Sequence, residues 1–576
     1  MRADAISGLV DGDSITVWAD TSGNDNDVSQ PVISLKPDFF ADSVNGMPIV
    51  SFNSANARLR RNPFSGFATT NITGIYVNRT TESNDGILSY ASSGGNNNFL
   101  FFRSNNIAIY RDNNVATGVS VNDDEWNIVQ GSWGSSGGRV ELWKNGRKDY
   151  NNTGFRSGTS ITSGGSLCIA HEQDSPDGGY AANQDHTGDF TEVIFYNTYI
   201  DSTDHIIIAN YLSAKYNIAL AANDLYDEDD TLNGNYDYEV AGIGRQSATS
   251  LNTDAQGSSI LRILNADDLD NNEYMIWGHD NGPRQASEFG DVPATVVARL
   301  ERVWRVSEVN SAGTAVDVGN VDVRFDLSSF GSIDSTDLRL LVDVDNDGVF
   351  SDETVGTGGV VTGASLVGGG VYVFEAVSAL ANNLRFTLST VDTASTPLPI
   401  DLLSFNASAL DNTAVLLSWK TASEINNERF VVQRSVDAQT WQTIEELAGY
   451  GNSDGIKRYS TEDSSTLSGI SYYRLKQIDF DGKTTYSQVR SVRIRNSRGS
   501  HLKVYPNPTD NVINIVGNEG GLTNLKVFNV MGSDITSQTR LVGKADSYRV
   551  SIDLSQLAPG VYFIIGDHTY TKVTRR

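Results

Sequence analysis

The sequence is built largely from short runs in which apolar and polar residues alternate, separated by clusters of glycine, asparagine and serine. Ser14–Trp18 and Arg139–Trp143 alternate in this way, Ile107–Tyr110 is a short apolar candidate strand, and one of the clusters is Ser93–Asn98. A period of two residues is that of a strand with one buried face, and the cluster residues satisfy turn dihedral angles and local hydrogen bonds. We therefore predict an all-β fold, and the 576 residues predict about four domains, each a β-sandwich.

One stretch has the period of a helix instead. Either Asp201 or Ser202 can cap its N-terminus, because both side chains accept hydrogen bonds from free backbone N–H groups. The apolar residues that follow share one face at helical spacing, and they are Ile207, Ile208, Tyr211, Leu212 and Tyr216. We interpret this face as core packing and the helix as the end of a first domain, a jelly roll at 1–220.

Changes in composition divide the rest of the chain into three further blocks. Residues 221–395 are rich in strand-like runs and end at the stiff Thr396–Pro399 linker. Residues 400–495 have the size of one seven-stranded sandwich, with Trp419 and the pair Tyr472–Tyr473 as its packing anchors. A polar linker at 496–501 precedes a small final domain at 502–576.

The charge of the chain restricts its partners. The formal net charge of −28 repels phosphate backbones and anionic membrane surfaces, so we predict no nucleic-acid partner. The same charge favours divalent cations, although it also keeps a protein soluble. No apolar run reaches the roughly 18 residues that a transmembrane helix needs. The only cysteine, Cys168, lies in a strand-like run, and we predict a buried, inert thiol.

The final domain carries several short motifs in a fixed order. They begin with Val504–Thr509 and continue through Leu525–Gly532, Ile552–Ser555, Leu557–Ile565 and Lys572–Val573. This order resembles the type A C-terminal sorting domain of type IX secretion substrates. The resemblance implies that the type IX secretion machinery is a partner, that the protein is secreted or lies on the outer cell surface, and that this domain is usually removed.

The residues that carry this resemblance also have local structural meanings. The two prolines beside Asn507 predict an extended opening segment, Gly532 can supply a positive φ, and Pro559–Gly560 fits a type II turn. The sorting residues are Tyr505, Pro506, Asn507, Pro508, Gly532, Pro559, Gly560 and Lys572. Export of this kind requires an N-terminal signal, and Met1–Ala5 has no apolar region, so we expect that signal to lie upstream of Met1.

Three weaker resemblances concern the other blocks. Residues 1–220 resemble a LamG-like, concanavalin A-like jelly roll in the segments Arg2–Ala5, Val17–Asp27 and Glu192–Asn197. Residues 221–395 resemble, through Ala241–Arg245, an uncharacterised domain that follows such jelly rolls, which implies no known activity. Residues 400–495 resemble a fibronectin type III-like module, which implies a spacer.

An acidic loop in the second block has the spacing of a calcium site. Asp343, Asp345 and Asp347 occupy its positions 1, 3 and 5, and Gly348 permits the tight turn after them. Ca²⁺ prefers several hard oxygen ligands, and position 12 of an EF-hand loop is a glutamate, whereas Thr354 stands here. We therefore predict a possible structural Ca²⁺ held by Asp343, Asp345, Asp347, the Val349 carbonyl, and Asp352 or Glu353. The alternative is a solvated acidic turn.

The sequence lacks the paired carboxylates of a glycosidase and the nucleophile elbow of a serine hydrolase, whereas a Ser-His-Asp site, whose members are distant in the chain, is not decided by sequence. Glycosidases need two carboxylates a few ångströms apart, and Glu141 and Glu192 are single acids in their predicted strands. The clusters His171–Asp174 and Asp185–His186 could each bind a metal or a sugar, but they fit no known zinc spacing, and we predict that they are surface loops. No Gly-x-Ser-x-Gly motif occurs. We predict that the protein is not an enzyme.

Ligand binding by a sandwich usually uses exposed aromatic rings beside amides and carboxylates. The predicted ligand-binding residues are Trp133, Trp143 and Tyr180, whereas Trp18 and Trp126 are predicted to fill the core. The leading interpretation is a non-enzymatic surface or released protein whose jelly roll binds a glycan or a protein. The alternatives are a secreted glycan-degrading enzyme and a purely structural adhesin.

Overall fold

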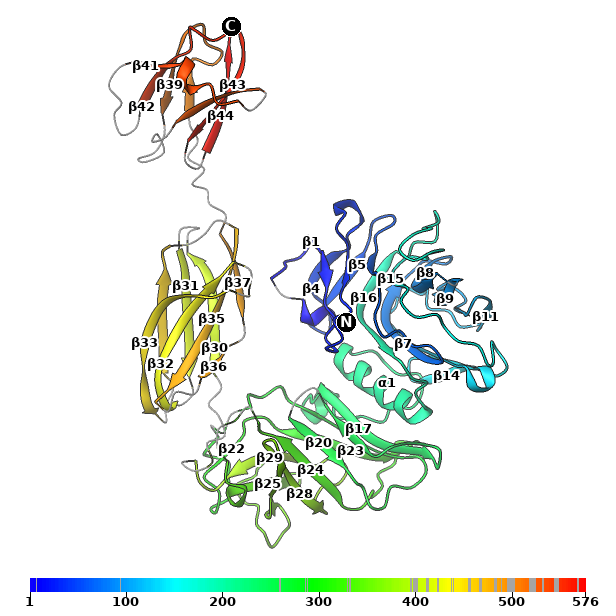
Figure 1. Cartoon of the computed structure of the whole chain (residues 1–576). Coiled ribbons are helices and arrows are strands. Elements are labelled where there is room, and N and C mark those ends of the chain that lie inside the picture. Colours follow the sequence, from blue (N-terminus) through cyan, green and yellow to red (C-terminus); the bar gives the residue numbers. More distant parts are fainter. Residues whose placement is uncertain are drawn as a thin grey trace.

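The structure is a computed structural model of the whole chain (Figure 1). The described residues are 1–6, 8–93, 95–257, 260–284, 286, 288–328, 330, 333–393, 396, 402–410, 414–421, 424–436, 438, 440–453, 457–465, 469–480, 484–487, 489–494, 503–516, 525–530, 533–542, 549–566 and 569–576. Paired strands form nearly all of its regular structure, and α1 (Ser202–Tyr216) is the one α-helix in these ranges. The prediction of a multidomain, all-β chain is confirmed.

The first domain is a sandwich of two eight-stranded antiparallel sheets. Its strands are β1 (Asp13–Ser14), β2 (Val17–Trp18), β3 (Val28–Ser29), β4 (Asp38–Val44), β5 (Met47–Phe52), β6 (Leu59–Arg61), β7 (Asn71–Thr80), β8 (Gly86–Ser92), β9 (Gly95–Phe102), β10 (Ala108–Tyr110), β11 (Asn114–Ala116), β12 (Asn127–Gly134), β13 (Arg139–Lys144), β14 (Arg147–Asn152), β15 (Ser166–Ile169) and β16 (Gly188–Tyr196). The first sheet has the order β1-β4-β5-β16-β7-β12-β13-β14, and we call it the helix-side sheet. The second has the order β11-β10-β9-β8-β15-β6-β3-β2, and we call it the loop-side sheet.

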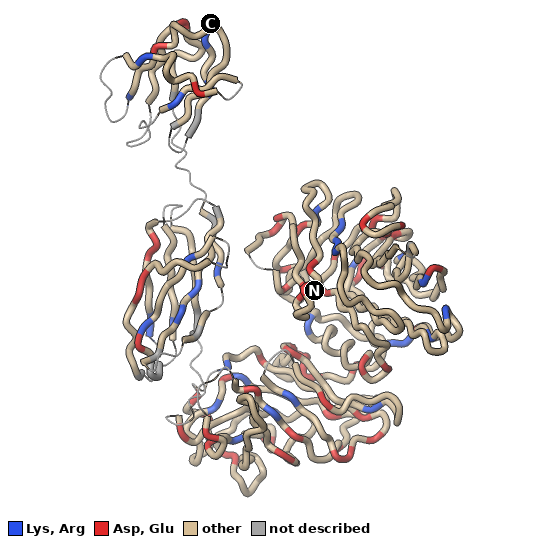
Figure 2. The backbone as a smooth tube through the Cα atoms, in the orientation of Figure 1, with Lys and Arg blue, Asp and Glu red and all other residues tan. Residues whose placement is uncertain are grey.

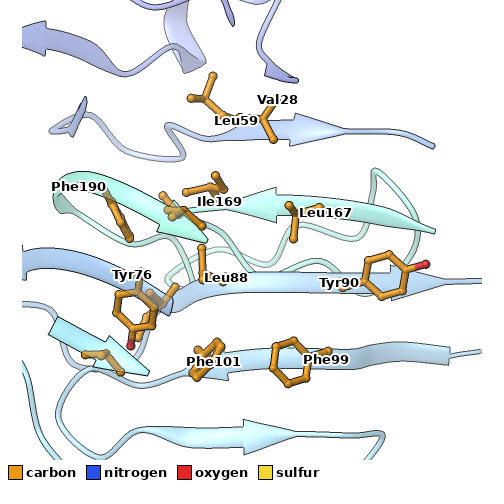
Figure 3. Close-up of a cluster of buried hydrophobic side chains, with 14 of the residues drawn as sticks. Val28, Leu59, Tyr76, Leu88, Tyr90, Phe99, Phe101, Leu167, Ile169 and Phe190 are labelled. Atoms are coloured by element: carbon orange, nitrogen blue, oxygen red, sulfur yellow. The ribbon is translucent and has the colours of Figure 1, made fainter. Parts of the chain in front are cut away.

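The core of the jelly roll lies between these two sheets (Figure 3). Alternate residues of the loop-side strands point inward, such as Leu88 and Tyr90 on β8 and Leu167 and Ile169 on β15. Phe101 of β9 meets Tyr76 of the opposite sheet edge to face, with ring centroids 5.4 Å apart. Burial of apolar side chains such as these is the main favourable contribution to the folding of such a sandwich.

Helix α1 follows β16 and lies on the outer face of the helix-side sheet. Asp201 is its cap, because the carboxylate accepts hydrogen bonds from the backbone N–H groups of Thr203 and Asp204, and Asn217 ends the helix in the left-handed conformation with φ 51°. Leu212 and Tyr216 face the sheet, as predicted, but Ile207 belongs to a different apolar cluster on the other side. The prediction of a single apolar face is therefore wrong, since the helix is buried on two sides.

The second domain pairs a larger and a smaller antiparallel sheet. Its strands are β17 (Tyr238–Ser247), β18 (Ser250–Asn252), β19 (Asp254–Gln256), β20 (Leu261–Leu264), β21 (Glu273–His279), β22 (Ala298–Arg299), β23 (Trp304–Asn310), β24 (Val321–Asp326), β25 (Leu338–Asp343), β26 (Val360–Val361), β27 (Ser365–Gly368), β28 (Val371–Val377) and β29 (Arg385–Thr390). The larger sheet has the order β18-β17-β21-β23-β29-β25-β26, with β22 beside β29. The smaller has the order β19-β20-β24-β28-β27, and Trp304, Phe325 and Phe386 lie in the core between the two.

The third domain is a smaller sandwich. Its strands are β30 (Leu402–Leu410), β31 (Ala414–Thr421), β32 (Glu424–Ser435), β33 (Gln442–Ser453), β34 (Lys457–Asp463), β35 (Gly469–Asp479), β36 (Thr484–Tyr486) and β37 (Arg490–Ile494). They form the sheets β30-β31-β34 and β33-β32-β35-β36, with β37 beside β35. Trp419 and Tyr473 lie in the core, as predicted, whereas Tyr472 points to the opposite side of β35. The predicted linker 496–501 and Pro397–Pro399 lie outside the described residues.

The final domain also has two small sheets. Its strands are β38 (Lys503–Tyr505), β39 (Val512–Val516), β40 (Lys526–Asn529), β41 (Arg540–Leu541), β42 (Arg549–Asp553), β43 (Gly560–Gly566) and β44 (Thr569–Arg575). Asn507 ties the opening segment to β44, because its amide donates to the Lys572 carbonyl (2.8 Å) and accepts from the Thr574 N–H (2.9 Å). The type II turn predicted at Pro559–Gly560 is wrong, since Gly560 begins β43 without the positive φ that this turn requires. Gly532 lies outside the described residues.

Candidate cation and ligand sites

The segment from His171 to His186 covers the outer face of the loop-side sheet. Gln173 fixes it, because its amide nitrogen donates to the carbonyls of Ser89 (2.9 Å) and Ser166 (2.8 Å), and its amide oxygen accepts from the Asp177 N–H (3.1 Å). His171, Glu172, Gln173 and His186 are all buried. The clusters lie in a loop segment and Asp174 is exposed, as predicted, but His171, Glu172, Gln173 and His186 are buried, so the prediction of surface loops is right only in part.

The histidines of this segment have clear structural partners. His186 contacts Asp85 at 2.5 Å, and the same carboxylate accepts from the Ser104 N–H (2.9 Å) and hydroxyl (2.7 Å). Burial alone would raise the pKa of Asp85, but the bonds from His186 and Ser104 outweigh it and the pKa is lowered. His171 contacts the Glu172 carbonyl at 2.8 Å through Nδ1. These groups hold the segment in place, and Asp85 is fully occupied.

Glu172 differs from the other acids of the jelly roll. Its side chain is 3% exposed, and among the described residues neither carboxylate oxygen has a hydrogen-bond partner. The Asn97 side chain interacts with it, and the Asn97 Oδ1 atom is likewise buried without a donor. Burial and, to a smaller extent, the nearby charge of Asp174 together raise the pKa of Glu172 to about 7, while the interaction with the Asn97 side chain acts in the opposite direction. Three buried oxygen atoms that lack donors are what a bound cation would satisfy.

The acidic loop of the second domain follows β25 directly. One oxygen from each of Asp343, Asp345 and Asp347 lies within 4.8 Å of the others, so the predicted clustering of these three carboxylates is confirmed. Gly348 has φ 97°, as the tight turn requires. The pKa of Asp345 is raised by desolvation and then by the charges of Asp347, Asp352 and Asp343. The cluster therefore has an excess of negative charge that a cation would reduce.

Other members of this loop are engaged by the protein itself. Asp343 is buried and accepts from Arg385 Nη2 (2.5 Å) and Nε (3.0 Å). Glu353 accepts from the Val344 N–H (2.7 Å) and the Thr357 hydroxyl (3.1 Å). Asp352 is exposed and contributes charge at Asp345, and the Val349 N–H donates to Asp347 (2.8 Å). Glu353 is thus already hydrogen-bonded and does not belong to the cluster of three carboxylates.

The aromatic residues predicted to bind ligand occupy three different environments. Trp133 is 0% exposed in the jelly-roll core, and its indole N–H donates to the Phe155 carbonyl (3.0 Å). Trp143 is 3% exposed and stacks on His205 of α1 at 4.9 Å. The prediction that these two rings are exposed is wrong, because the core and α1 cover them.

Tyr180 is half-buried under the Arg58 guanidinium, 3.9 Å from its ring centroid. Trp18 is buried as predicted, but Trp126 is only half-buried.

The two strand acids considered for catalysis are held in ion pairs. Glu141 accepts from Arg139 (2.5 Å) and Lys148 (2.9 Å), which outweigh burial and lower its pKa. Glu192 accepts from Lys215 (2.9 Å) and the Tyr216 hydroxyl (2.8 Å). Both side chains are buried.

A cleft of about 590 Å³ opens at one end of the jelly roll. Phe64, Phe67 and Phe195 line it together with the polar residues Asn24 and Asn26. These residues come from three segments that are far apart in the sequence. No sequence pattern marked this cleft, because only the fold brings the segments together.

Comparison with known proteins assigns three parts of the chain. Residues 503–576 match the model of the secretion system C-terminal sorting domain, residues 60–225 match the pentaxin family, and residues 204–374 match a domain of unknown function, DUF8202. C-reactive protein of Xenopus laevis is 35% identical over 126 residues, which are 21% of this chain and 52% of that protein. The rat (Rattus norvegicus) sushi, von Willebrand factor type A, EGF and pentraxin domain-containing protein 1 is 28% identical over 109 residues, 18% of this chain and 3% of that protein.

Two solved structures are similar at low identity. A native heptameric SAP-like pentraxin from Limulus polyphemus has a TM-score of 0.25 and 19% identity, with 28% of this chain and 81% of that chain covered. Domain 4 of the arabinanase AbnA from Geobacillus stearothermophilus, in complex with arabinotriose, has a TM-score of 0.23 and 11% identity, with 29% and 79% covered. Among the described residues, no helix is long and apolar enough to cross a membrane. The chain thus carries a type IX secretion sorting domain at residues 503–576, which makes it a secreted or cell-surface protein, and its N-terminal jelly roll matches the pentaxin family over residues 60–225.

Proposed function

We propose that this is a non-enzymatic binding protein of the cell exterior, whose jelly roll captures a glycan or a protein ligand through a divalent cation at Glu172. The observation that carries the proposal is the group of three buried oxygens, two on Glu172 and one on Asn97, that lack hydrogen-bond donors among the described residues. A buried carboxylate without a partner is costly, and a cation removes that cost. Asp174, whose charge acts on Glu172, is the next candidate to hold the ion.

A cation in this place explains how a jelly roll could bind ligand without an aromatic platform. Ca²⁺ takes six to eight oxygen ligands, and a site built from a few side chains leaves positions open. Hydroxyl groups of a glycan or a carboxylate of a protein ligand could fill those positions. The match to the pentaxin family, which spans Glu172, supports a ligand-binding jelly roll.

Calorimetry on the full chain tests the cation site. The wild-type protein should bind Ca²⁺, and Glu172→Gln should abolish that binding event because it removes the charge at similar volume. Glu125→Gln, which changes an exposed acid of the same domain, is the matched control and should bind as the wild type does. The titrations are then repeated with Asp345→Ala introduced into the wild type and into both variants, so that Ca²⁺ binding by the acidic loop is removed from the signal. Equal Ca²⁺ binding by wild type and Glu172→Gln in that background would refute the site.

Ligand capture is tested separately. A glycan array and a panel of surface proteins, probed with the full chain in Ca²⁺ and then in chelator, should show binding that chelator and Glu172→Gln both remove. A reducing-sugar release assay addresses the enzymatic alternative. The ion pairs of Glu141 and Glu192 support the non-enzymatic proposal, because neither carboxylate is free to act as acid or nucleophile. Sugar release that survives in chelator would overturn it.

The acidic loop of the second domain supports a second, structural Ca²⁺. Asp343, Asp345 and Asp347 are the proposed ligands, and the Arg385 contact with Asp343 already balances part of their charge. We propose that the third domain acts as a spacer between this pair of domains and the sorting domain. Figure 2 shows Asp and Glu spread along the whole chain, so cations outside the two proposed sites would be only loosely attracted.

A further inference from the structure

Helix α1 lies between the jelly roll and the second domain (Figure 1). It is buried almost all round, with apolar side chains directed to both sides. A helix at the edge of a single domain presents one apolar stripe and one polar face, whereas a helix that is apolar all round needs cover on every side. Two parts of the molecule provide that cover, one on each side of the helix.

The helix-side sheet of the jelly roll covers one side of α1. Leu212 and Tyr216 pack there against Ile75 and Val77 of β7 and Ile128 of β12. Buried polar groups add to this contact: His205 lies 2.8 Å from the Gln130 Oε1 atom and 3.0 Å from the Ser132 hydroxyl.

The larger sheet of the second domain covers the other side. Ile206, Ile207 and Ala214 of α1 form a buried cluster with residues of β17, β21, β23, the connecting segment and β13, namely Val240, Tyr274, Ile276, Val309, Leu225, Tyr226 and Trp143. Ile276 and Tyr274 alternate along β21 with Met275 and Trp277, which face the second domain's own core. The larger sheet therefore has two apolar faces. The smaller sheet of the second domain covers one of them, and α1 covers the other.

Hydrogen bonds fix the register between the helix and the second domain. The Thr203 hydroxyl donates to the Ser250 carbonyl (2.7 Å) and accepts from the Gln246 N–H (3.0 Å). The capping Asp201 also accepts from the Leu251 N–H (3.2 Å) of β18. The N-terminus of α1 is thus shared between the two domains.

The segment that connects the two domains is also fixed in place. Asn210 of α1 accepts from the N–H groups of Leu225 (2.8 Å) and Tyr226 (3.1 Å), and Asn223 donates to the Gly146 carbonyl of the jelly roll (2.8 Å). The two family matches overlap here, since the pentaxin match ends at residue 225 and the match to the domain of unknown function begins at residue 204.

We infer that the jelly roll and the domain of unknown function form one cooperative folding unit, and that a function of the second domain is to complete the jelly roll by covering α1. Separation of the two would expose Ile206, Ile207 and Trp143 on one side and Tyr274 and Ile276 on the other. Such a large apolar patch is not stable in water. The predicted boundary at 220/221 would lie within this unit. The inference does not depend on the proposed binding function.

Hydrogen exchange of the full chain in increasing denaturant tests this coupling. Phe325→Ala removes a ring from the second domain's core, in the smaller sheet that faces away from α1, and Phe430→Ala is the matched change in the third domain's core. Phe325→Ala should lower the denaturant midpoint for exchange in β7, β12 and α1 by the same amount as in β21 and β24. Phe430→Ala should leave all five at their wild-type midpoints.

Two results would overturn the inference. The first is a lower midpoint in β21 and β24 with wild-type midpoints in β7 and β12, which would mean that the domains unfold separately. The second is two separate midpoints for these segments in the wild-type protein. If Phe325→Ala does not fold, the milder Phe325→Leu gives the same comparison with a smaller shift.

Discussion

Individual polar residues in this protein differ mainly in whether their burial is matched by partners. Asp85 and Glu172 are both buried beside the same covering segment, yet the pKa of Asp85 is lowered by His186 and Ser104 while burial raises that of Glu172 to about 7. An acid that the fold buries without donors calls for a physical explanation, such as a bound ion, a water molecule or a proton on the carboxyl itself. The same reasoning identifies Asp343 as partly structural, because Arg385 already pairs with it.

The raised pKa of Glu172 predicts a pH dependence in the absence of cations. A carboxyl group with a higher pKa in the folded state than in the unfolded state is protonated in the folded protein between the two values. Stability should therefore fall as pH rises from 4.5 to about 7. Glu228 and Glu308 have pKa values raised in the same way, so the test is a difference between proteins.

The measurement is the melting temperature in chelator at pH 5 and at pH 8. The wild-type protein should lose more stability between these pH values than Glu172→Gln, and added Ca²⁺ should restore the wild-type loss. Identical pH dependence in the two proteins would show that Glu172 does not titrate as inferred.

At the acidic loop, Asp345→Ala should reduce the rise in melting temperature that Ca²⁺ causes. Asp345 is exposed and makes its contribution through charge, so the variant should fold and should resemble the wild type in chelator. Differential scanning calorimetry with and without Ca²⁺ measures the effect. Glu375→Ala changes an exposed acid elsewhere in the same domain and should keep the full Ca²⁺ response. An undiminished response in Asp345→Ala would argue against a cation in this loop.

Among the secondary-structure elements, α1 is the one whose observed burial departs most from what its sequence predicts. Its cap and its length follow from local residues, but its second buried side follows from contact with the larger sheet of the second domain. The final domain gives a similar example. Pro559–Gly560 has the composition of a type II turn, yet Gly560 is drawn into β43 because that strand pairs with β44 along its whole length.

The cap of α1 can be tested by substitution. Asp201→Ala removes the acceptor for Thr203, Asp204 and Leu251, and should destabilise the protein by about 1–2 kcal/mol in denaturant unfolding. Asp201→Asn keeps one capping oxygen and should lose markedly less. An Asp201→Ala protein as stable as the wild type would mean that the cap contributes little beside the packing of the helix.

At the scale of the whole molecule, the chain combines a jelly roll, for which we propose ligand binding, with a signal for export. The match over residues 503–576 makes it a type IX secreted or cell-surface protein. The two sandwiches that share α1 precede a third sandwich, and the sorting domain comes last. This order places the export signal at the end farthest along the sequence from the jelly roll.

Removal of residues 503–576 should trap the protein in the periplasm, because the segment that the secretion machinery recognises is then absent. Cell fractionation and immunoblotting measure the distribution. Asn507→Ala, which removes the two hydrogen bonds between the opening segment and β44, should reduce export, whereas Asn252→Ala, far away in the second domain, should not. Normal export of the truncated chain would contradict the sorting role.

The sequence by itself determined the class of fold, the place where the helix begins, the acidic loop and the sorting domain, because each of these depends on residues that are close together in the chain. Alternation of apolar and polar residues sets strands, and the spacing of Asp343, Asp345 and Asp347 brings their carboxylates together through one turn. Only the tertiary structure decided that Trp133 and Trp143 are covered, that Glu172 is buried without donors, and that α1 serves two domains. These features depend on contacts between surfaces whose residues are far apart in the sequence, and local periodicity carries no information about such contacts.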